Sequence, residues 1–233
     1  MPVRVLTWNL FHGRAVPPAG RELFDEFADA LRGWEWDVAL LQEVPPWWPP
    51  ALATRLDAAQ RYVLTSRNFA LPIRRAIATR RPDVIKSNGG GANAILIRGD
   101  TIAEHRIRRL SIWPERRWMH AVRMDRAGAW MANLHGGGSL RDVHGAAAAA
   151  RAWAGAAPLV LGGDFNIRGL TLDGFERAAG HEVDYVFVRD LTPPGASRAE
   201  VLDHGHLSDH APVRAALMSS PAPSPRSPAT PSP

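Results

Sequence analysis

The sequence predicts an α/β fold in which two mixed β-sheets pack face to face and helices cover the outside. Strand-like and helix-like patterns alternate near both ends of the chain. In the middle, four strand-like runs follow one another between residues 93 and 134. The link Asp125–Gly128 between the last two runs suits a hairpin. Consecutive hairpins do not fit a simple doubly wound parallel sheet, whereas an α/β sandwich accommodates them.

In the first half of the chain, apolar runs predict strands and helical spacing predicts a helix. The helix is expected over residues 21–34, where Leu23, Phe27 and Leu31 recur at helical spacing. Residues 66–91 are rich in arginine and are expected to be irregular. The other elements expected here are strands at residues 3–8, 37–42 and 62–65 and a short proline-initiated helix at residues 49–59.

In the second half, an alanine-rich helix is expected over residues 142–155, because Pro158 stops it. A short helix is expected near residues 171–179. The strands expected in this half lie at residues 93–98, 101–113, 117–126, 129–134, 159–163, 184–189, 198–203 and 212–217.

The length of 233 residues, 45% of them hydrophobic, fits one domain of the larger sort with one sizeable core. We expect this domain to span residues 1–217. Residues 218–233 are rich in proline, serine and alanine, so they are expected to form a disordered tail. The chain shows no internal repeat.

The composition excludes several classes of protein. Without cysteine, the chain has no disulfide framework, thiolate metal site or cysteine nucleophile. No stretch approaches the ~18–20 apolar residues of a membrane span, and no secretory signal is visible. We therefore expect a cytoplasmic monomer without a membrane span.

The chain is basic, with a formal net charge of +5 and a pI near 10.8. The positive residues are almost all arginine, and Lys86 is the only lysine. An excess of positive charge favours a partner that carries phosphate groups. A coding sequence rich in G and C would also produce an arginine-rich composition, so charge alone leaves the partner open.

Five polar clusters follow apolar, strand-like runs or lie shortly beyond one. They use side chains that bind hard metal ions or move protons. Their convergence on one edge of a sheet would form a single catalytic pocket. The clusters are Thr7-Trp8-Asn9, Gln42-Glu43, Asn133-Leu134-His135, Gly163-Asp164-Phe165-Asn166 and Ser208-Asp209-His210.

Glu43 and Asn9 are the first candidates for a metal site. Mg²⁺ prefers oxygen ligands, few carboxylates and several retained waters. A Glu at the end of a strand and the nearby carbonyl of Asn9 would supply a sparse site of that kind. A solvent-facing Glu43 at the start of a loop is the alternative.

Asp164 and Asn166 follow two glycines, which permit close approach of the backbone. Asp164 can orient a water or accept its proton, and the Asn166 amide can donate to a phosphoryl oxygen. The alternative is an Asx-turn that only caps the strand. His135 could likewise stabilise charge on phosphate, or serve only the structure.

His210 has the side chain best suited to activate water near neutral pH. Its neighbour Asp209 points elsewhere in an extended segment, so Asp209 is a candidate metal ligand. Asp184 is the candidate to orient the imidazole. A nucleophilic triad built on Ser208 is disfavoured, because Ser208 lacks the Gly-x-Ser-x-Gly setting.

In order along the chain, the clusters resemble the motifs of the endonuclease/exonuclease/phosphatase (DNase I-like) superfamily. The resemblance spans about residues 3–217 and includes Val183-Asp184-Tyr185-Val186 and Ser208–Val213. It also includes Gly91–Arg98, with Ile97 where the family usually has serine. The family fold is a four-layer α/β/β/α sandwich, and the family reaction is metal-dependent hydrolysis of phosphate esters. Each motif alone is weak, but the ordered set is highly specific.

The resemblance implies a role for each residue. Glu43, Asn9 and Asp209 would hold Mg²⁺, with Mn²⁺ as an alternative. His210, oriented by Asp184, would be the base or a phosphate contact, and Asp164 would position or deprotonate the water. Asn166 and His135 would bind the scissile phosphate. The three glycines after His135 depart from the family pattern, and no tyrosine stands where some nucleases of the family use one.

The leading hypothesis is a metal-dependent phosphodiesterase that acts on nucleic acid, with arginines at 74–81 and 106–117 as a groove for the phosphate backbone. These arginines could equally form a solvated face. The alternatives are hydrolysis of small phosphorylated metabolites or lipid headgroups, and a non-catalytic nucleic-acid-binding domain. His12, close to Asn9 in sequence, is either near the site or a plain loop residue.

Overall fold

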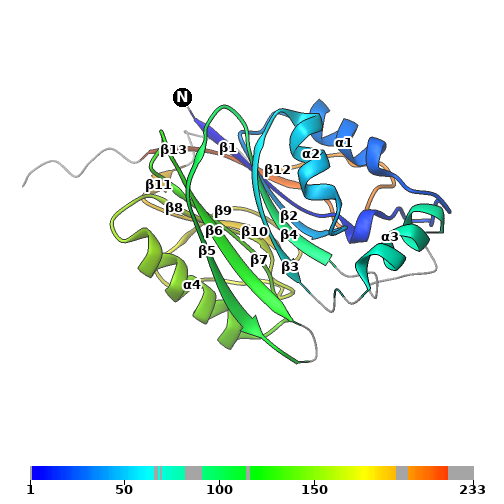
Figure 1. The fold of residues 1–233 in the computed structure, drawn as a ribbon. Helices are drawn as coiled ribbons and strands as arrows, with labels where there is room; N and C mark the ends of the chain where they lie inside the picture. Colours follow the sequence, from blue (N-terminus) through cyan, green and yellow to red (C-terminus); the bar gives the residue numbers. More distant parts are fainter. Residues whose placement is uncertain are drawn as a thin grey trace, which may run out of the picture.

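The computed structural model describes residues 2–65, 68, 70–81, 91–113, 116–192 and 199–219, which form two β-sheets packed face to face (Figure 1). The first sheet contains β1 (Val3–Asn9), β2 (Val38–Val44), β3 (Ala59–Thr65), β4 (Gly91–Ile97), β11 (Leu191–Thr192), β12 (Glu200–Val201) and β13 (Val213–Ser219). The second contains β5 (Ile102–Ser111), β6 (Arg117–Met124), β7 (Trp130–His135), β8 (Leu159–Asp164), β9 (Glu176–His181) and β10 (Asp184–Arg189). Their orders are β11-β13-β1-β2-β4-β3, with β12 also on β13, and β5-β6-β7-β8-β10-β9.

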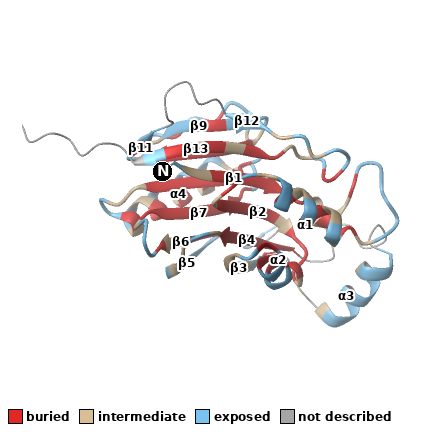
Figure 2. Ribbon diagram, turned by 90° about the horizontal axis from the view of Figure 1, so that it is seen from above, coloured by how far each residue is buried: buried red, intermediate tan, exposed pale blue. Residues whose placement is uncertain are grey.

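Helices cover the outer face of each sheet and complete a four-layer sandwich. Side chains of α1 (Phe24–Gly33) and α2 (Trp48–Leu56) pack on the first sheet, and those of α4 (Leu140–Ala154) pack on the second. A third apolar cluster fills the space between the sheets. The buried middles of the strands are visible in Figure 2. This architecture confirms the predicted α/β/β/α sandwich.

The pairing of the central strands determines where the functional side chains lie. In the first sheet β1 runs parallel to β2, with Asn9 opposite Gln42. In the second sheet β7 runs parallel to β8, with His135 opposite Asp164, and antiparallel β10 begins at Asp184 opposite Asp164. Parallel strands end at the same edge of a sheet, so the polar clusters gather at one edge of each sheet.

Two glycines allow β8 to lie tightly between its neighbours. Gly163 has a φ of 140°, and a Cβ built there would lie 1.9 Å from the backbone oxygen of Leu134. A Cβ on Gly162 would lie 2.7 Å from the Leu40 side chain of the first sheet. A larger residue at position 163 would therefore push Asp164 away from β7.

The helix expected near residues 171–179 is wrong. This segment forms a turn followed by β9, which pairs with β10. Gly174 has a φ of 74°, which a helix does not accept. Leu172 and Phe175 anchor the turn against the core that α4 also contacts.

The irregular structure expected over residues 66–91 is also wrong in part, because α3 (Leu71–Arg80) lies within it. No described side chain of α3 is buried, so the helix has no apolar stripe that periodicity could detect (Figure 2). Proline near its first turn favours the helix start.

Several boundaries also differ from the predicted ones. β3 begins at Ala59 rather than residue 62, and α2 ends at Leu56. β12 is two residues long, whereas a strand was expected over residues 198–203. β13 continues to Ser219, where it pairs with β11. The rest of the predicted tail, residues 220–233, lies outside the described residues. No helix among the described residues is long and apolar enough to cross a bilayer.

Candidate active site

The candidate site lies where the two sheets meet at their common edge. Several of its residues have left-handed backbone angles, which are strained in residues other than glycine and often occur at functional positions. Glu43 has a φ of 48°, Asn166 of 54° and Ser208 of 66°. The strands thus deliver the side chains, and the sharp turns after them aim the side chains into one space.

Asp164 is the centre of the cluster. It is 1% exposed, and one carboxylate oxygen accepts a hydrogen bond from the Asn9 amide at 3.0 Å. The other oxygen accepts one from the backbone N–H of Asn166 at 2.8 Å. The His135 Nε2 lies 3.5 Å from the first oxygen. Asp164 therefore connects the first sheet, through Asn9, with the second sheet.

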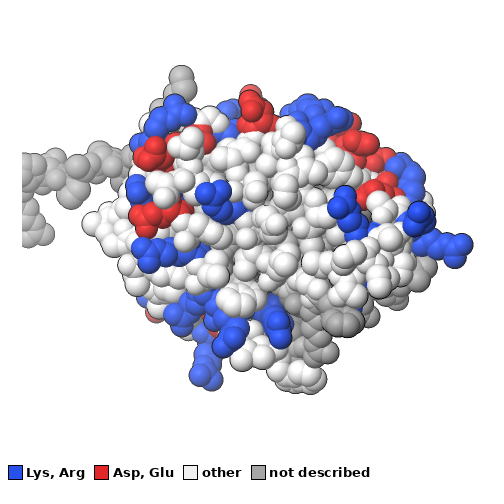
Figure 3. Space-filling model, in the orientation of Figure 1, with Lys and Arg blue, Asp and Glu red and all other residues white. Residues whose placement is uncertain are grey.

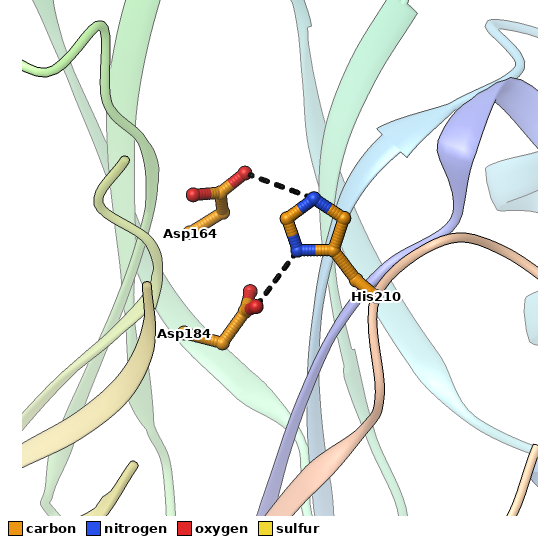
Figure 4. Close-up of side chains that lie close together, drawn as sticks. All are labelled: Asp164, Asp184 and His210. Atoms are coloured by element: carbon orange, nitrogen blue, oxygen red, sulfur yellow. Dashed lines mark hydrogen bonds and ion pairs between the residues drawn. The ribbon is translucent and has the colours of Figure 1, made fainter. Parts of the chain in front are cut away.

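His210 lies between two buried carboxylates, as Figure 4 shows. Its Nδ1 is 2.7 Å from Asp184 Oδ2, and its Nε2 is 3.9 Å from Asp164 Oδ2. The indole of Trp8 donates to the His210 carbonyl at 2.9 Å and so fixes the backbone. Asp184 orients the ring, and Nε2 faces the centre of the cluster.

The hydroxyl of Ser208 bonds only to backbone groups among the described residues, which gives it a structural role. Its hydroxyl donates to the backbone oxygen of Asn9 at 2.6 Å and accepts from the backbone N–H of His210 at 3.1 Å. These bonds attach the His210 segment to the end of β1. A nucleophilic triad on Ser208, disfavoured from the sequence, also lacks a Ser208–imidazole contact among the described residues.

Glu43 contacts two imidazoles. Its carboxylate oxygens lie 3.1 Å from His12 Nε2 and 3.6 Å from His135 Nε2. Burial would raise the pKa of Glu43, but the hydrogen bond and charge of His12, with the charges of His135 and Arg117, lower it to about 2. Glu43 is therefore an ionised carboxylate at neutral pH.

His12 is a site residue that the sequence alone left undecided. It lies in a short left-handed turn after β1, with a φ of 55°. The side-chain Oδ1 of Asn9 accepts from the backbone N–H of Phe11 at 2.9 Å, which folds this turn back toward Glu43. The only signal in the sequence was the closeness of His12 to Asn9.

Asp209 and Asn166 lie at the periphery of the cluster. The Asp209 side chain is 43% exposed, and its Oδ1 is 4.0 Å from His210 Nε2. The Asn166 amide donates to the Gly136 oxygen at 3.0 Å, which holds the loop after His135 beside the site.

Burial and charge shift the pKa values of the central groups. Burial raises the pKa of Asp164, although His210 and two hydrogen bonds oppose this effect. Burial raises the pKa of Asp184 to about 6 against the hydrogen bond from His210. The pKa of His210 rises to about 9, because Asp184, Asp164 and Asp209 outweigh its burial. In the Asp184–His210 pair the rise at His210 dominates, since three carboxylates surround its ring.

The donor set fits a divalent cation. Asp184 Oδ1 is buried and has no hydrogen-bond partner among the described residues. Ligand atoms of Asp164, Asp184 and His210 lie within 4.8 Å of one another and could hold a metal ion. The predicted ligands Glu43, Asn9 and Asp209 are a different set from this group, and they offer oxygens, the type that Mg²⁺ prefers. The side chains leave the identity of the ion open.

All predicted site residues belong to one connected set of contacts. Asn9, Asn166, His135 and His210 surround Asp164; Asp184 and Asp209 join through His210, and Glu43 joins through His135. One cluster of side chains can therefore present carboxylates, imidazoles and amides to one phosphate group.

Comparison with known proteins identifies a family whose sequence pattern this chain matches. A sequence model of the endonuclease/exonuclease/phosphatase family matches residues 6–210. No curated protein sequence matches.

Many solved structures share the fold. An endonuclease/exonuclease/phosphatase from Beutenbergia cavernae is 19% identical in sequence, and its structure superimposes with a TM-score of 0.71. The match covers 96% of this chain and 73% of the Beutenbergia chain. The mannosyl-6-phosphatase of Bacteroides thetaiotaomicron is 16% identical with a TM-score of 0.66, and the match covers 93% of this chain and 99% of the phosphatase chain. TDP2 from Caenorhabditis elegans is 13% identical with a TM-score of 0.65, and the match covers 94% of this chain and 76% of the TDP2 chain.

Proposed function

Because this chain belongs to the endonuclease/exonuclease/phosphatase family, we propose that it is a divalent-metal-dependent hydrolase of phosphate esters, acting as a phosphodiesterase on nucleic acid. The observation that carries the proposal is the connected cluster around Asp164, in which His210 is 2.7 Å from Asp184 and 3.9 Å from Asp164. A non-catalytic binding domain would not need to retain these strained and buried polar groups.

Each side chain of the cluster has a role in the proposed reaction. Asp164 orients the attacking water, and its proton goes either to Asp164 or to His210, which can accept it only in the neutral form that prevails above its pKa of about 9. Asp184 holds the His210 ring so that Nε2 faces the phosphate. Asn166 and His135 donate hydrogen bonds to the phosphoryl oxygens, where negative charge grows as the bond to water forms.

Glu43, Asn9 and Asp209 are the proposed holders of the divalent ion. When bound, such an ion polarises a phosphoryl oxygen and neutralises charge on the leaving oxygen. His12 and His135 contact the Glu43 carboxylate and keep it in place at the end of β2. The fit to Mg²⁺ follows from the predominance of oxygen donors, and Mn²⁺ is the alternative.

Hydrolysis of a small phosphorylated metabolite is a second candidate. The similarity to the mannosyl-6-phosphatase, which extends over 99% of that chain, favours it. The net charge of +5 favours nucleic acid.

The test is a substrate panel with Mg²⁺, Mn²⁺ or EDTA: plasmid DNA, single-stranded DNA, RNA, bis-p-nitrophenyl phosphate and sugar or inositol phosphates. We expect metal-dependent cleavage of at least one nucleic acid. Glu43→Gln and His210→Ala should each lower kcat at least about a hundredfold, in line with the loss of one acid–base or charge-stabilising group. His144→Ala, on the exposed side of α4, is the matched control. Unchanged rates for both site variants would refute the assignment.

A further inference from the structure

An arginine-lined groove lies between β5 and the first turns of α4. Its cavity has a volume of about 630 Å³, within the range of ligand-binding pockets. Arg108 and Arg109 of β5 line one side, and Arg141 of α4 lines the other. In Figure 3, Arg and Lys side chains gather on the lower part of this face, over the ends of β5 and α4. We call this cavity the arginine groove.

The arginines of the groove differ from those beside them. Arg106 and Arg123 pair with Glu104 at 3.1 and 2.9 Å. Arg108, Arg109 and Arg141 are exposed, and their guanidinium groups form no hydrogen bond or ion pair in the described part of the chain. Asp142 is the one acidic residue of the lining. Three like charges around one cavity repel each other, and a bound anion would relieve that repulsion.

The groove lies on the outer, α4-covered face of the second sheet, whereas the side chains of His135 and Asp164 turn toward the first sheet; both places lie near the edge where β7 and β8 end. A strand bound at both places would pass over that edge. Arg108 is opposite Met119, Met119 is opposite Leu134, and Leu134 is opposite Gly163. Leu134 and Gly163 directly precede His135 and Asp164. With neighbouring strands ~4.8 Å apart, the Arg108 backbone lies about 10 Å from β7 and about 14 Å from β8.

This separation distinguishes between substrate classes. A nucleic-acid strand in a duplex places one phosphate roughly every 3.4 Å along its axis, so about 10–14 Å corresponds to three or four phosphates. A metabolite with a single phosphate cannot occupy both places. Ile112 and Trp113, at the end of the groove, are 60% and 76% exposed. Aromatic and apolar side chains beside guanidinium groups are typical of surfaces that bind single strands.

We propose that the arginine groove binds non-scissile phosphates of a polynucleotide strand whose scissile phosphate lies at Asp164 and His210. This inference rests on the proposed function and specifies its substrate. Arg108, Arg109 and Arg141 supply sequence-independent contacts to the backbone, and the strand leaves the catalytic cluster toward β5.

The test measures binding separately from cleavage. Fluorescent single-stranded DNA of 4, 8 and 16 nucleotides is titrated in EDTA at several NaCl concentrations, and anisotropy gives Kd. The variants are Arg109→Gln and the triple change of Arg108, Arg109 and Arg141 to Gln. The control is Arg177→Gln on β9, the opposite edge strand of the same sheet.

The triple variant should bind the 8-mer and 16-mer at least about tenfold more weakly, and its slope of log K against log salt should be shallower by about 0.7 per lost contact. Arg177→Gln should behave like the wild type. A triple variant that retains wild-type Kd and slope would overturn the proposal. So would a loss of affinity for anionic vesicles without any loss for DNA, which would assign the groove to a membrane surface.

Hydrolysis of bis-p-nitrophenyl phosphate by the wild type separates the two proposals, because this diester is too small to reach the groove. If the wild type hydrolyses it and the triple variant binds DNA normally, only the groove proposal fails. If the wild type hydrolyses no ester but the triple variant loses DNA binding, the catalytic proposal fails, and the groove is a DNA-binding surface without the proposed link to a scissile phosphate.

Discussion

Asp164 and Asp184 illustrate how position decides the chemistry of identical side chains. Both are buried, and burial raises both pKa values. Asp164 accepts two hydrogen bonds and faces the centre of the cluster. Asp184 uses one oxygen for His210, while its other oxygen has no partner among the described residues. Asp164 is therefore placed to act on a substrate, and Asp184 acts through the imidazole.

The change Asp184→Asn tests that division of roles. The amide keeps the size of the side chain but removes the charge that favours imidazolium. In the metal-free protein, the pKa of His210 should fall from about 9 toward its usual 6.5. The measurement is an NMR titration of the His210 ring, together with kcat, which should fall at least about tenfold.

The control is Asp190→Asn, at the exposed residue that directly follows β10. An unchanged His210 titration in Asp184→Asn would show that Asp184 does not govern the imidazole.

Among single residues, those at strand ends could be predicted from the sequence, and His12 could not. Asn9, Glu43, His135 and Asp164 each follow or end an apolar run, so the strand itself determines where they emerge. His12 reaches Glu43 only because the turn after β1 takes left-handed backbone angles. Such angles in residues other than glycine depend on tertiary contacts, which the sequence pattern does not reveal.

At the scale of elements, burial on one side made an element predictable. α1 and α4 each bury an apolar face and follow the expected boundaries within a few residues. α3 buries none, and its helical pattern was missed. β9, which lies in the segment expected to be a helix, has a single buried residue and takes its strand conformation by pairing with β10. Short elements without their own buried face take their conformation from neighbours.

The β7–β8 pair carries a prediction at this scale. Gly163→Ala would place a Cβ 1.9 Å from the Leu134 oxygen at a φ of 140°. Strain and overpacking together should lower the free energy of unfolding by about 3 kcal/mol or more. Urea denaturation measures this change.

Gly137→Ala is the matched control, because no atom lies within 4 Å of the added Cβ and its φ is not left-handed. Its free energy of unfolding should change by no more than about 0.5 kcal/mol. Equal stability of the two variants would contradict the close packing at position 163.

Across the whole molecule, the two sheets are joined by a buried polar contact as well as by apolar packing. Gln42 of the first sheet donates to Asn133 of the second at 2.8 Å, and Asn133 donates back to the Leu41 and Ala94 backbone at 2.9 Å. Buried amides tolerate few alternative arrangements, so these bonds fix how one sheet lies on the other. That alignment brings Glu43 and Asn9 to His135 and Asp164.

A site shared by both sheets should couple metal binding to the stability of the entire fold. Glu43 and Asn9 come from the first sheet, and the groups that they contact come from the second. An ion bound only by the folded state adds about 2.7 kcal/mol at a hundred times its Kd. For a protein of this size that corresponds to a Tm increase of roughly 5–10 °C.

Differential scanning calorimetry in saturating Mg²⁺ and in EDTA measures the shift. Glu43→Gln should abolish most of it, whereas Glu176→Gln, exposed on β9, should retain it. Equal shifts in both variants would exclude Glu43 as a ligand.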